Sequence, residues 1–457
     1  MIKKVLIANR GEIALRIIRA CRELGIATVA VYSQADATSL HVTMADEAYC
    51  IGPKEATKSY LHIPALISVA LTSGADAIHP GYGFLSERAD FADICEQHHI
   101  KFIGPTAESM RLLGDKATAR KLMIENNVPV TPGTGLLESV EEIEEFASKV
   151  GYPIILKATA GGGGKGMRIV NSGSEIEENF NLCKQEAQNA FGNDGVYAEK
   201  FLINPRHVEV QILADSKGNV IHLGERDCSI QRRHQKLLEE APSVCVSASL
   251  REKMGAVAVN AAKASRYESA GTVEFLVDVN SKDKDGNNSF YFMEMNTRVQ
   301  VEHPVTEMVT NVDIVKEQIL IADGKKLSYK QSDIQITGHA IECRINAEDS
   351  EKNFRPSAGK ITGIIKPGGF GTRVDSHVYT GYEIPPYYDS LIGKLICWGR
   401  TREEARLRTL RALNEYIITG IKTTVPFHTK IMEHPQYIKG NIDTGFLEKV
   451  LNESKED

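Results

Sequence analysis

The sequence predicts an α/β protein made of several packed units, and three observations support this prediction. Near the start, apolar stretches of strand length alternate with helical stretches, which is typical of a parallel sheet covered by helices. The length of 457 residues is enough for two to four packed units. The composition, 42% hydrophobic and 25% charged, is ordinary for a soluble globular protein.

The first block, which runs to about residue 113, alternates strands with helices. Lys4–Ala8 has the pattern of a buried strand, and a turn at Asn9–Gly11 leads into a helix that ends near Glu23. The turn, NRGE, lacks the glycine fingerprint of dinucleotide binding, so NAD is not predicted. The loop His79–Phe84, HPGYGF, follows a strand and is placed either to bind a ligand or to form a Pro-Gly turn with a packed tyrosine. Further strands are expected at Ala27–Tyr32, Ala75–His79 and Lys101–Ile103.

From Lys116 to about Gly324 the pattern changes. A loop, Thr159–Gly166, joins two short expected strands, and a Ser174/Glu177 capping box predicts the start of a helix that ends near Ala190. A hairpin is expected where a strand ending near Val279 meets Phe290–Asn296. The other expected strands are Ile154–Ala158, Met167–Val170, Val196–Leu202 and His207–Ala214.

The final block, from about Ile334 to Phe446, has several strand patterns. It also has a helix from Thr401 to about Ile417, opened by a Thr401/Glu404 capping box.

The glycine-rich run Gly161–Gly166 is the first candidate ligand loop. It contains GxGxxG, but a dinucleotide-binding loop is followed by a helix, and here a strand follows. It is not a Walker A loop, because Gly166 follows Lys165 where Ser or Thr is required. A strand–loop–strand of this kind is typical of a flap whose backbone N–H groups close over phosphates, with Lys157 placed to pair with phosphate oxygens. The alternatives are a purely structural loop and a solvated lysine.

The stretch Phe292–Pro304, FMEMNTRVQVEHP, has polar residues at every second position, which share one face if the stretch is an extended strand. They are Glu294, Asn296, Arg298, Gln300 and Glu302. At ~3.3 Å per residue the row spans roughly 26 Å, too long for one reaction centre, so we predict two sub-sites. The first two residues would hold a hard metal ion, and the last three would bind and deprotonate a small anion. A half-buried strand with a solvated polar face is the alternative.

Two further groups of residues indicate phosphate and metal chemistry. Glu274 lies on an expected strand whose hairpin partner contains Glu294, and two carboxylates on one face repel unless a cation such as Mg²⁺ relieves the repulsion. The alternative is that they face opposite ways. The segment Gly224–Pro242 is rich in donors that suit phosphate or bicarbonate, although a charge run is more often a solvated face. These donors are Arg226, Gln231, Arg232, Arg233, His234 and Lys236.

Charge and cysteine content exclude several classes of protein. The formal net charge of −6 argues against a general nucleic-acid binder. No run of ~18 apolar residues is present, so no membrane span is expected, and the start lacks the features of a signal peptide. The eight cysteines form no CxxC pair, which favours reduced thiols in a cytoplasmic protein.

Six segments, spread over essentially the whole chain, together resemble the biotin carboxylase family of ATP-grasp enzymes. They are Ile7–Ala14 (IANRGEIA), His79–Glu87 (HPGYGFLSE), Lys157–Arg168 (KATAGGGGKGMR), Glu225–Lys236 (ERDCSIQRRHQK), Glu294–Glu307 (EMNTRVQVEHPVTE) and Arg344–Asp349 (RINAED). The resemblance implies an α/β protein with an α+β core and three domains. These are a Rossmann-like pre-ATP-grasp domain (1–113), an ATP-grasp domain (114–324) with a mobile glycine-rich lid (about 131–203), and a C-terminal biotin carboxylase domain (334–446). The long hairpin loop Asn280–Asn288 departs from the family and is expected to lie away from the chemistry.

The resemblance also implies roles for individual residues. The catalytic residues would be Glu302, as general base, with Arg298, Lys236 and Arg344. Bicarbonate would be held by Lys236, Arg298, Gln300 and the backbone of Val301. Biotin would contact Arg344 and Tyr82, and Mg²⁺ or Mn²⁺ would bind Glu274, Glu294 and Asn296. The residues around ATP would be Lys116, Lys157, Gly163, Gly164, Glu199, Lys200, Phe201, Leu202, His207, Gln231, His234, Glu274 and Glu294.

The activity implied by the resemblance is the ATP-dependent carboxylation of biotin by bicarbonate through carboxyphosphate, as in the first half-reaction of acetyl-CoA carboxylase. A pyruvate carboxylase or another acyl-CoA carboxylase is the alternative parent complex. The chain has no Met-Lys-Met biotinyl-lysine motif, so biotin is expected on a separate biotin carboxyl carrier protein. Carboxyltransferase subunits are further expected partners, and the expected assembly is a homodimer. The rival functions are another ATP-grasp ligase with an amine acceptor and an ATP-binding module without activity.

Overall fold

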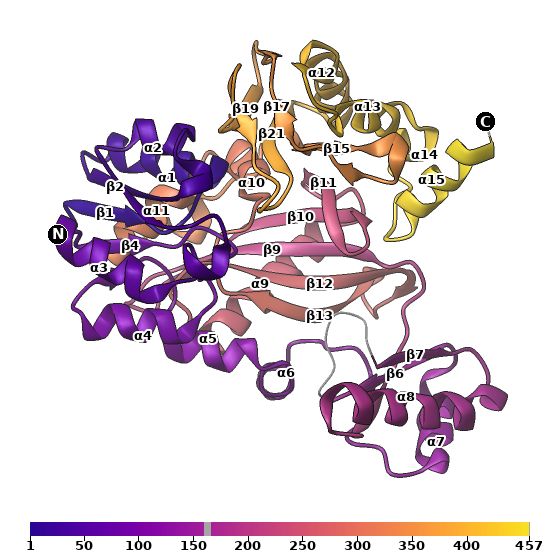
Figure 1. The fold of residues 1–457 in the computed structure, drawn as a ribbon. Helices are drawn as coiled ribbons and strands as arrows, with labels where there is room; N and C mark the ends of the chain where they lie inside the picture. The colour runs from indigo at the N-terminus through magenta and orange to yellow at the C-terminus, as the bar shows by residue number, and fades with distance from the viewer. Residues whose placement is uncertain (160–165, 457) are drawn as a thin grey trace.

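The computed structural model describes residues 1–159 and 166–456, and its N-terminal part is a five-stranded parallel sheet in the order β3-β2-β1-β4-β5 (Figure 1). Alternate residues of β1 lie in different cores, with Val5 and Ile7 on the side of α1, and Leu6 and Ala8 on the side of α3 and α4. The predicted α/β fold is therefore present. The elements are β1 (Lys4–Ile7), β2 (Ala27–Ser33), β3 (Glu47–Gly52), β4 (Ala77–His79), β5 (Lys101–Phe102), α1 (Gly11–Glu23), α3 (Ile63–Ser73) and α4 (Ala89–Gln97).

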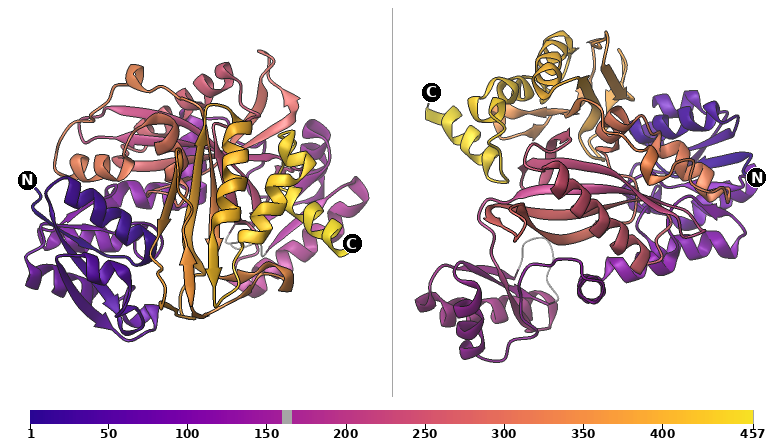
Figure 2. Two further views of the ribbon diagram at one scale, coloured as in Figure 1. Left: turned by 90° about the horizontal axis from the view of Figure 1, so that it is seen from above. Right: turned by 180° about the vertical axis from the view of Figure 1, so that it is seen from behind.

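An eight-stranded sheet in the order β13-β12-β9-β10-β11-β14-β21-β19 occupies the centre of the molecule (Figures 1 and 2). All its neighbouring strands are antiparallel, and it joins strands of the central block to strands of the final block through the β11–β14 pair. Its strands are β9 (Arg206–Ala214), β10 (Val220–Arg232), β11 (Gln235–Ala241), β12 (Ser269–Lys282), β13 (Asn288–Asn296), β14 (His339–Asn346), β19 (Thr372–Ser376) and β21 (Leu391–Gly399). The helices packed on it include α9 (Ala248–Ala264), α10 (His303–Thr310) and α11 (Ile314–Ala322).

A small unit with its own hydrophobic core projects from the large sheet (Figure 1). Its sheet has the order β7-β6-β8, and two helices cover it. The predicted Ser174/Glu177 capping box is wrong, because residues 173–175 form a 3-10 turn and α8 starts at Ile176 without a side-chain cap. The glycine-rich loop between β6 and β7 lies mostly outside the described residues. The elements are β6 (Ile154–Ala158), β7 (Met167–Val170), β8 (Val196–Lys200), α7 (Val140–Val150) and α8 (Ile176–Phe191).

The final part of the chain packs helices against β14 and β21 in a separate core. The Thr401 cap is confirmed, since its hydroxyl accepts a hydrogen bond from the backbone N–H of Glu404 at 3.2 Å. The helix ends at Glu415, short of the predicted end, because β22 (Ile417–Thr419) begins there. The helices are α12 (Arg402–Glu415), α13 (Val425–Glu433) and α15 (Phe446–Glu456). No helix among the described residues is long and apolar enough to span a membrane.

The predicted strand over Phe292–Pro304 is wrong beyond Asn296. The ladder with β12 ends at the pair Thr272–Asn296, and α10 begins at His303. Pro304 lies in the first turn of α10, where a proline needs no hydrogen-bond partner for its nitrogen. The intervening residues 297–302 bend, so the polar side chains do not form a straight row.

Candidate active site

Lys236, on β11, lies at the centre of a buried charge cluster. Its ammonium nitrogen is 2.5 Å from Glu209 Oε2, 2.9 Å from Glu274 Oε1 and 2.7 Å from Glu302 Oε1. Burial lowers the pKa of Lys236, but these three carboxylates raise it well above its ordinary value. One cation therefore binds carboxylates from β9, from β12 and from the residue that precedes α10.

Glu302 is fully buried and both its oxygens are engaged. Oε1 accepts from Lys236, and Oε2 accepts from Arg344 Nη2 at 2.9 Å. Burial alone raises the pKa of Glu302, but Lys236, Arg344 and Arg226 lower it well below its usual range. The carboxylate is therefore ionised at neutral pH inside the protein.

Arg344, on β14, is shared between two carboxylates. Its Nε donates to Glu239 Oε1 at 2.6 Å, while Nη2 donates to Glu302. Burial raises the pKa of Glu239 to about 7, against the opposing charge of Arg344. We define the Lys236 cluster by the three cations and four carboxylates in this network: Lys236, Arg226, Arg344, Glu209, Glu239, Glu274 and Glu302.

Glu274 connects the two predicted sub-sites. Its Oε1 accepts from Asn296 Nδ2 at 2.8 Å and from Gln300 Nε2 at 2.9 Å, in addition to Lys236. The straight strand assumed in that prediction is therefore wrong, while the metal-binding and anion-binding roles of its two halves stay predictions. The bend after Asn296 brings residues from both halves of that stretch onto one carboxylate.

The cross-strand carboxylate pair is confirmed, because Glu274 and Glu294 lie directly opposite each other on β12 and β13. Burial raises the pKa of Glu294, and the neighbouring Glu274 raises it further. Lys116 Nζ is 3.9 Å from Glu294, with most of the lysine side chain exposed. At this distance the lysine offsets only part of the repulsion between the two carboxylates. A divalent cation with oxygen ligands fits the pair, because it would offset the remaining repulsion.

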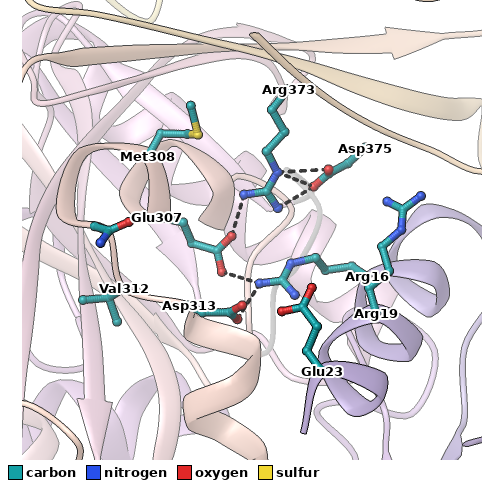
Figure 3. A pocket seen from close by; sticks show the side chains of 10 residues that line it. Arg16, Arg19, Glu23, Glu307, Met308, Val312, Asp313, Arg373 and Asp375 are labelled. Carbon is teal, nitrogen blue, oxygen red and sulfur yellow. Dashed lines mark hydrogen bonds and ion pairs between the residues drawn. The ribbon is translucent and has the colours of Figure 1, made fainter. Parts of the chain in front are cut away.

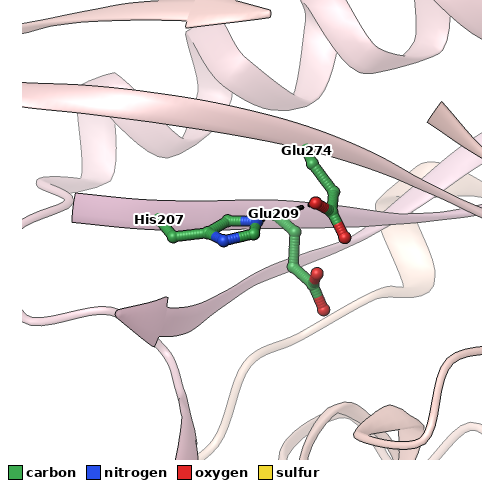
Figure 4. A group of neighbouring side chains, drawn as sticks. All are labelled: His207, Glu209 and Glu274. Carbon is green, nitrogen blue, oxygen red and sulfur yellow. Dashed lines mark ion pairs between the residues drawn. The ribbon is translucent and has the colours of Figure 1, made fainter. Parts of the chain in front are cut away.

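His207 and Glu209, on β9, lie beside Glu274 (Figure 4). Donor atoms of these three residues all lie within 4.8 Å of one another. His207 Nε2 is 2.8 Å from Glu274 Oε2, and its other nitrogen is 2.6 Å from Gln231 Nε2. Glu274 is thus the one predicted metal ligand that also belongs to this three-residue group.

Arg298, which was predicted to bind bicarbonate, is held by polar partners on several sides. Its Nε donates to Glu87 Oε2 at 3.1 Å, Nη1 donates to Gln300 Oε1 at 2.8 Å, and Nη2 donates to Asn296 Oδ1 at 3.3 Å. Tyr82, from the N-terminal domain, donates its hydroxyl proton to Glu12.

Some of the predicted nucleotide residues lie on or next to the small unit, and one lies in the turn between β10 and β11. Lys157 Nζ, on β6, forms an ion pair of 2.6 Å with Glu199 Oε2 on β8. His234 is exposed in the turn between β10 and β11, with a φ of +64°. Lys200, Phe201 and Leu202 lie at the end of β8 and just after it. Gly163 and Gly164 lie outside the described residues.

Sequence reasoning missed three carboxylates of the site, Glu87, Glu209 and Glu239. Glu209 carried a usable signal, because His207, Glu209 and Gln211 alternate with apolar residues along β9. Glu239 becomes part of the site only through the pairing of β11 with β14, which no local pattern indicates. Glu87 lies in the HPGYGFLSE segment, far in sequence from the arginine that it binds.

A second charge cluster lines a cavity of about 360 Å³ beside α1 (Figure 3). Arg373 Nη1 is 2.7 Å from Glu307 Oε2, and Arg373 Nη2 is 2.7 Å from Asp375 Oδ2. Arg16 Nη2 is 2.9 Å from Glu307 Oε1. Arg16 Nη2 is also 2.5 Å from Asp313 Oδ1. We call Arg16, Glu307, Asp313, Arg373 and Asp375 the Arg373 cluster; none of these residues was predicted to bind a substrate.

Three family models match the chain in succession. The N-terminal domain of biotin carboxylase matches residues 1–110. The ATP-binding domain of the carbamoyl-phosphate synthase L chain matches 115–330, and the C-terminal domain of biotin carboxylase matches 342–449. The fold and these matches define an ATP-grasp enzyme.

Similarity to individual proteins extends over the full length. The biotin carboxylase of Nostoc sp. is 60% identical over 448 residues, which cover 98% of this chain and 99% of that protein. A pyruvate carboxylase subunit of Methanothermobacter thermautotrophicus is 54% identical over 450 residues, covering 98% and 90%. Among solved structures, one similar to this chain is the biotin carboxylase domain dimer of the Hydrogenobacter thermophilus 2-oxoglutarate carboxylase. That structure is a complex with MgADP, ADP and bicarbonate. It has a TM-score of 0.87 and 52% sequence identity, and the match covers 98% of both chains.

The chain belongs to the biotin carboxylase family. Its activity is that of a biotin carboxylase, an ATP-dependent ligase.

Proposed function

We propose that this enzyme carboxylates biotin presented by a separate carrier protein, and that Glu302 is the base that deprotonates bicarbonate. One observation supports the base assignment above all others. Glu302 is a fully buried carboxylate, kept ionised by a lysine on one oxygen and an arginine on the other. A buried ionised carboxylate accepts a proton without first losing a water shell.

Bicarbonate is bound, in this proposal, by the cationic and amide groups next to Glu302. Lys236 and Arg298 offset its charge, and Gln300 and the backbone of Val301 orient it. Gln300 already contacts both Arg298 and Glu274, so its side chain has a fixed position. The arrangement suits a small planar anion with several oxygen acceptors.

The reaction begins when Glu302 takes the proton of bicarbonate. The freed bicarbonate oxygen attacks the γ-phosphorus of ATP, and the bond to the bridging oxygen of ADP breaks, which gives carboxyphosphate. Carboxyphosphate then yields CO₂ and phosphate, and the phosphate removes the proton from biotin N1. Arg344 offsets the negative charge on the biotin ureido oxygen, with Tyr82 nearby, and N1 attacks CO₂ to form carboxybiotin.

ATP and its metal ion occupy, in this proposal, the region between the small unit and the β12–β13 hairpin. Glu274, Glu294 and Asn296 would hold Mg²⁺ or Mn²⁺, which supplies charge neutralisation for phosphoryl transfer. Lys157 would leave Glu199 for the phosphates when the glycine-rich lid closes and excludes water. The remaining ATP residues are those of the family pattern: Lys116, Gly163, Gly164, Glu199, Lys200, Phe201, Leu202, His207, Gln231 and His234.

The domain boundaries are part of the proposal. We assign 1–113, 114–324 with a lid at about 131–203, and 334–446. The small three-stranded sheet with its separate core supports a lid that moves as one body.

The proposed partners are a biotin carboxyl carrier protein and carboxyltransferase subunits, with a homodimer as the assembly. The relative from Hydrogenobacter, whose structure is a dimer, supports the assembly. Acetyl-CoA carboxylase is the proposed parent complex and pyruvate carboxylase the alternative, since part of a pyruvate carboxylase is also similar. A cytoplasmic location agrees with the eight cysteines, all unpaired within the described chain.

The direct test of this function is ADP release from Mg-ATP, measured with and without bicarbonate, free biotin and biotinylated carrier protein. We expect ADP release to require bicarbonate and to rise with biotin, and to rise further with the carrier. Release that is indifferent to biotin, or that rises with an amine acceptor instead, would contradict the proposal.

A further inference from the structure

Lys394 is a fully buried lysine in the middle of β21. In the antiparallel pairing of β14 with β21 it lies directly opposite Arg344. No role was predicted for it from the sequence. A lysine in a buried strand is retained only where its charge and its three donor hydrogens are used.

The contacts of Lys394 join three segments that are distant in sequence. Its Nζ donates to the backbone oxygen of Val301 at 2.8 Å and lies 3.1 Å from Glu12 Oε1 on α1. The same Glu12 oxygen accepts the hydroxyl proton of Tyr82. One ammonium group therefore connects the turn before α10 with Tyr82 in the N-terminal domain.

The contact with Val301 fixes the direction of a peptide N–H group. In a trans peptide the C=O and N–H bonds point to opposite sides, so binding the oxygen of Val301 turns the N–H of Glu302 away from Lys394. The preceding peptide is held in the same way, since His303 Nδ1 lies 2.8 Å from the oxygen of Gln300. Binding of that oxygen directs the N–H of Val301.

The two N–H groups directed in this way have no hydrogen-bond acceptor among the residues that the structure describes. Among the hydrogen bonds between described residues, neither the N–H of Val301 nor that of Glu302 is a donor. Successive free N–H groups of this kind form an anion-binding concavity. One of these two N–H groups belongs to Val301, the residue whose backbone is proposed to bind bicarbonate.

Lys394 is charged in this environment. Burial lowers its pKa, but Glu12, Glu342 and Asp375 raise it above the ordinary value. The ammonium group lies on the oxygen side of the Val301–Glu302 peptide, opposite the N–H that would face bicarbonate. Its positive charge therefore also favours a negative ligand on the N–H side.

We propose that Lys394 is a positioning residue for biotin carboxylation, which holds the bicarbonate-binding peptide at Val301 directly and the biotin-side Tyr82 through Glu12. This inference rests on the proposed function, in which Val301 and Tyr82 contact the two substrates. Lys394 itself touches neither substrate. From one position it fixes the orientation of the Val301 peptide and, through Glu12, of the Tyr82 side chain.

The test is the kinetics of Lys394→Met in the full-length enzyme, with ADP release as the assay. We expect the KM for bicarbonate and the KM for free biotin each to rise at least ~10-fold, because both substrate contacts lose their support. The KM for ATP should stay within about 2-fold, since the nucleotide residues lie on other segments. Arg373→Met is the matched control: it removes a half-buried cation from the neighbouring strand β19 and should leave all three KM values unchanged.

A second variant separates positioning from the loss of a charge partner. Glu12→Gln/Lys394→Met removes both charges together, so it leaves no unpaired carboxylate at Glu12. We expect it to have a raised KM for bicarbonate even if the single variant does not fold. A folded variant of either kind with wild-type KM values for bicarbonate and biotin would overturn the inference. Absence of biotin-dependent ADP release in the wild type would instead contradict the proposed function.

Discussion

The Lys236 cluster and the Arg373 cluster are built from the same kinds of residue, yet their electrostatics differ. In the Arg373 cluster two arginines bind three carboxylates, of which Glu307 contacts both arginines. Burial alone raises the pKa of Glu307, but Arg16 and Arg373 lower it to about 2. The pKa of Asp375 is lowered in the same way, chiefly by Arg373 acting against burial. Both acids are therefore ionised at neutral pH.

In the Lys236 cluster four carboxylates share three cations, and their pKa values diverge. Burial alone raises the pKa values of Glu302 and Glu274, but Lys236 lowers both well below the ordinary value, together with Arg344 at Glu302 and with His207 at Glu274. Burial raises the pKa of Glu209, and it raises that of Glu239 to about 7. The arginines of the Arg373 cluster thus lower the pKa of Glu307 and Asp375 alike, whereas the Lys236 cluster keeps carboxyl groups of different acidity side by side, as acid–base chemistry requires.

The largest effect is expected from Lys236→Met, which removes the cation that three carboxylates share. Biotin-dependent ADP release should fall by about 10²–10³-fold, the effect of losing one preorganised charge from a reaction centre. A rate within ~3-fold of the wild type would contradict a catalytic role for the Lys236 cluster. The assay is ADP release under saturating substrates, with folding checked by circular dichroism.

A stability effect is expected from Arg373→Met. Loss of this arginine leaves Glu307 and Asp375 without a shared partner, so the free energy of unfolding should drop by about 3–5 kcal/mol. Activity per folded molecule should stay within about 2-fold, because the Arg373 cluster does no chemistry. Urea unfolding gives the first quantity and ADP release below the transition gives the second. A large loss of activity without a loss of stability would contradict the structural role.

A smaller, pH-dependent effect is expected from Glu239→Gln. The folded pKa of Glu239, about 7, lies above the ordinary glutamate value of 4.5. Between these values the folded state binds more protons than the unfolded state, so wild-type stability falls as pH rises through this window. The slope is at most about 1.4 kcal/mol per pH unit.

Glutamine cannot titrate, so Glu239→Gln should lack this part of the slope. Thermal unfolding of both proteins at several pH values between 4.5 and 7 measures the difference. Parallel stability curves would show that Glu239 is ionised in the folded protein.

Four strands of the N-terminal sheet were predictable because each is a short apolar run, whereas β3, which was not predicted, is mostly half-buried and carries no such run. The hairpin of β12 and β13 was predictable from the polar turn between two apolar runs, and its register confirms the Glu274–Glu294 pair. The alternation of polar and apolar residues continues past Asn296, and there it wrongly predicted that the strand continues. The signal against it was Pro304, which favours a helix start over a strand.

Other parts of the site were beyond local patterns. Glu239 reaches Arg344 because β11 pairs with β14, and Lys394 reaches Val301 because β21 packs beneath the turn before α10. Such contacts depend on sheet order and on packing between domains. Lys394 stands in a mostly apolar segment, LIGKLICWG, where sequence alone gives a lysine no partner.

The measurement that tests the central claim most directly compares Glu302→Gln with Glu307→Gln in the same ADP-release assay. Both changes remove the charge of a buried glutamate that is bound by two cationic side chains. We expect Glu302→Gln to lose at least ~10²-fold in biotin-dependent rate while still binding ATP, because it removes the base. Glu307→Gln should lose stability but keep its rate per folded molecule. Wild-type-like turnover by Glu302→Gln, or an equal loss in both variants, would contradict the account.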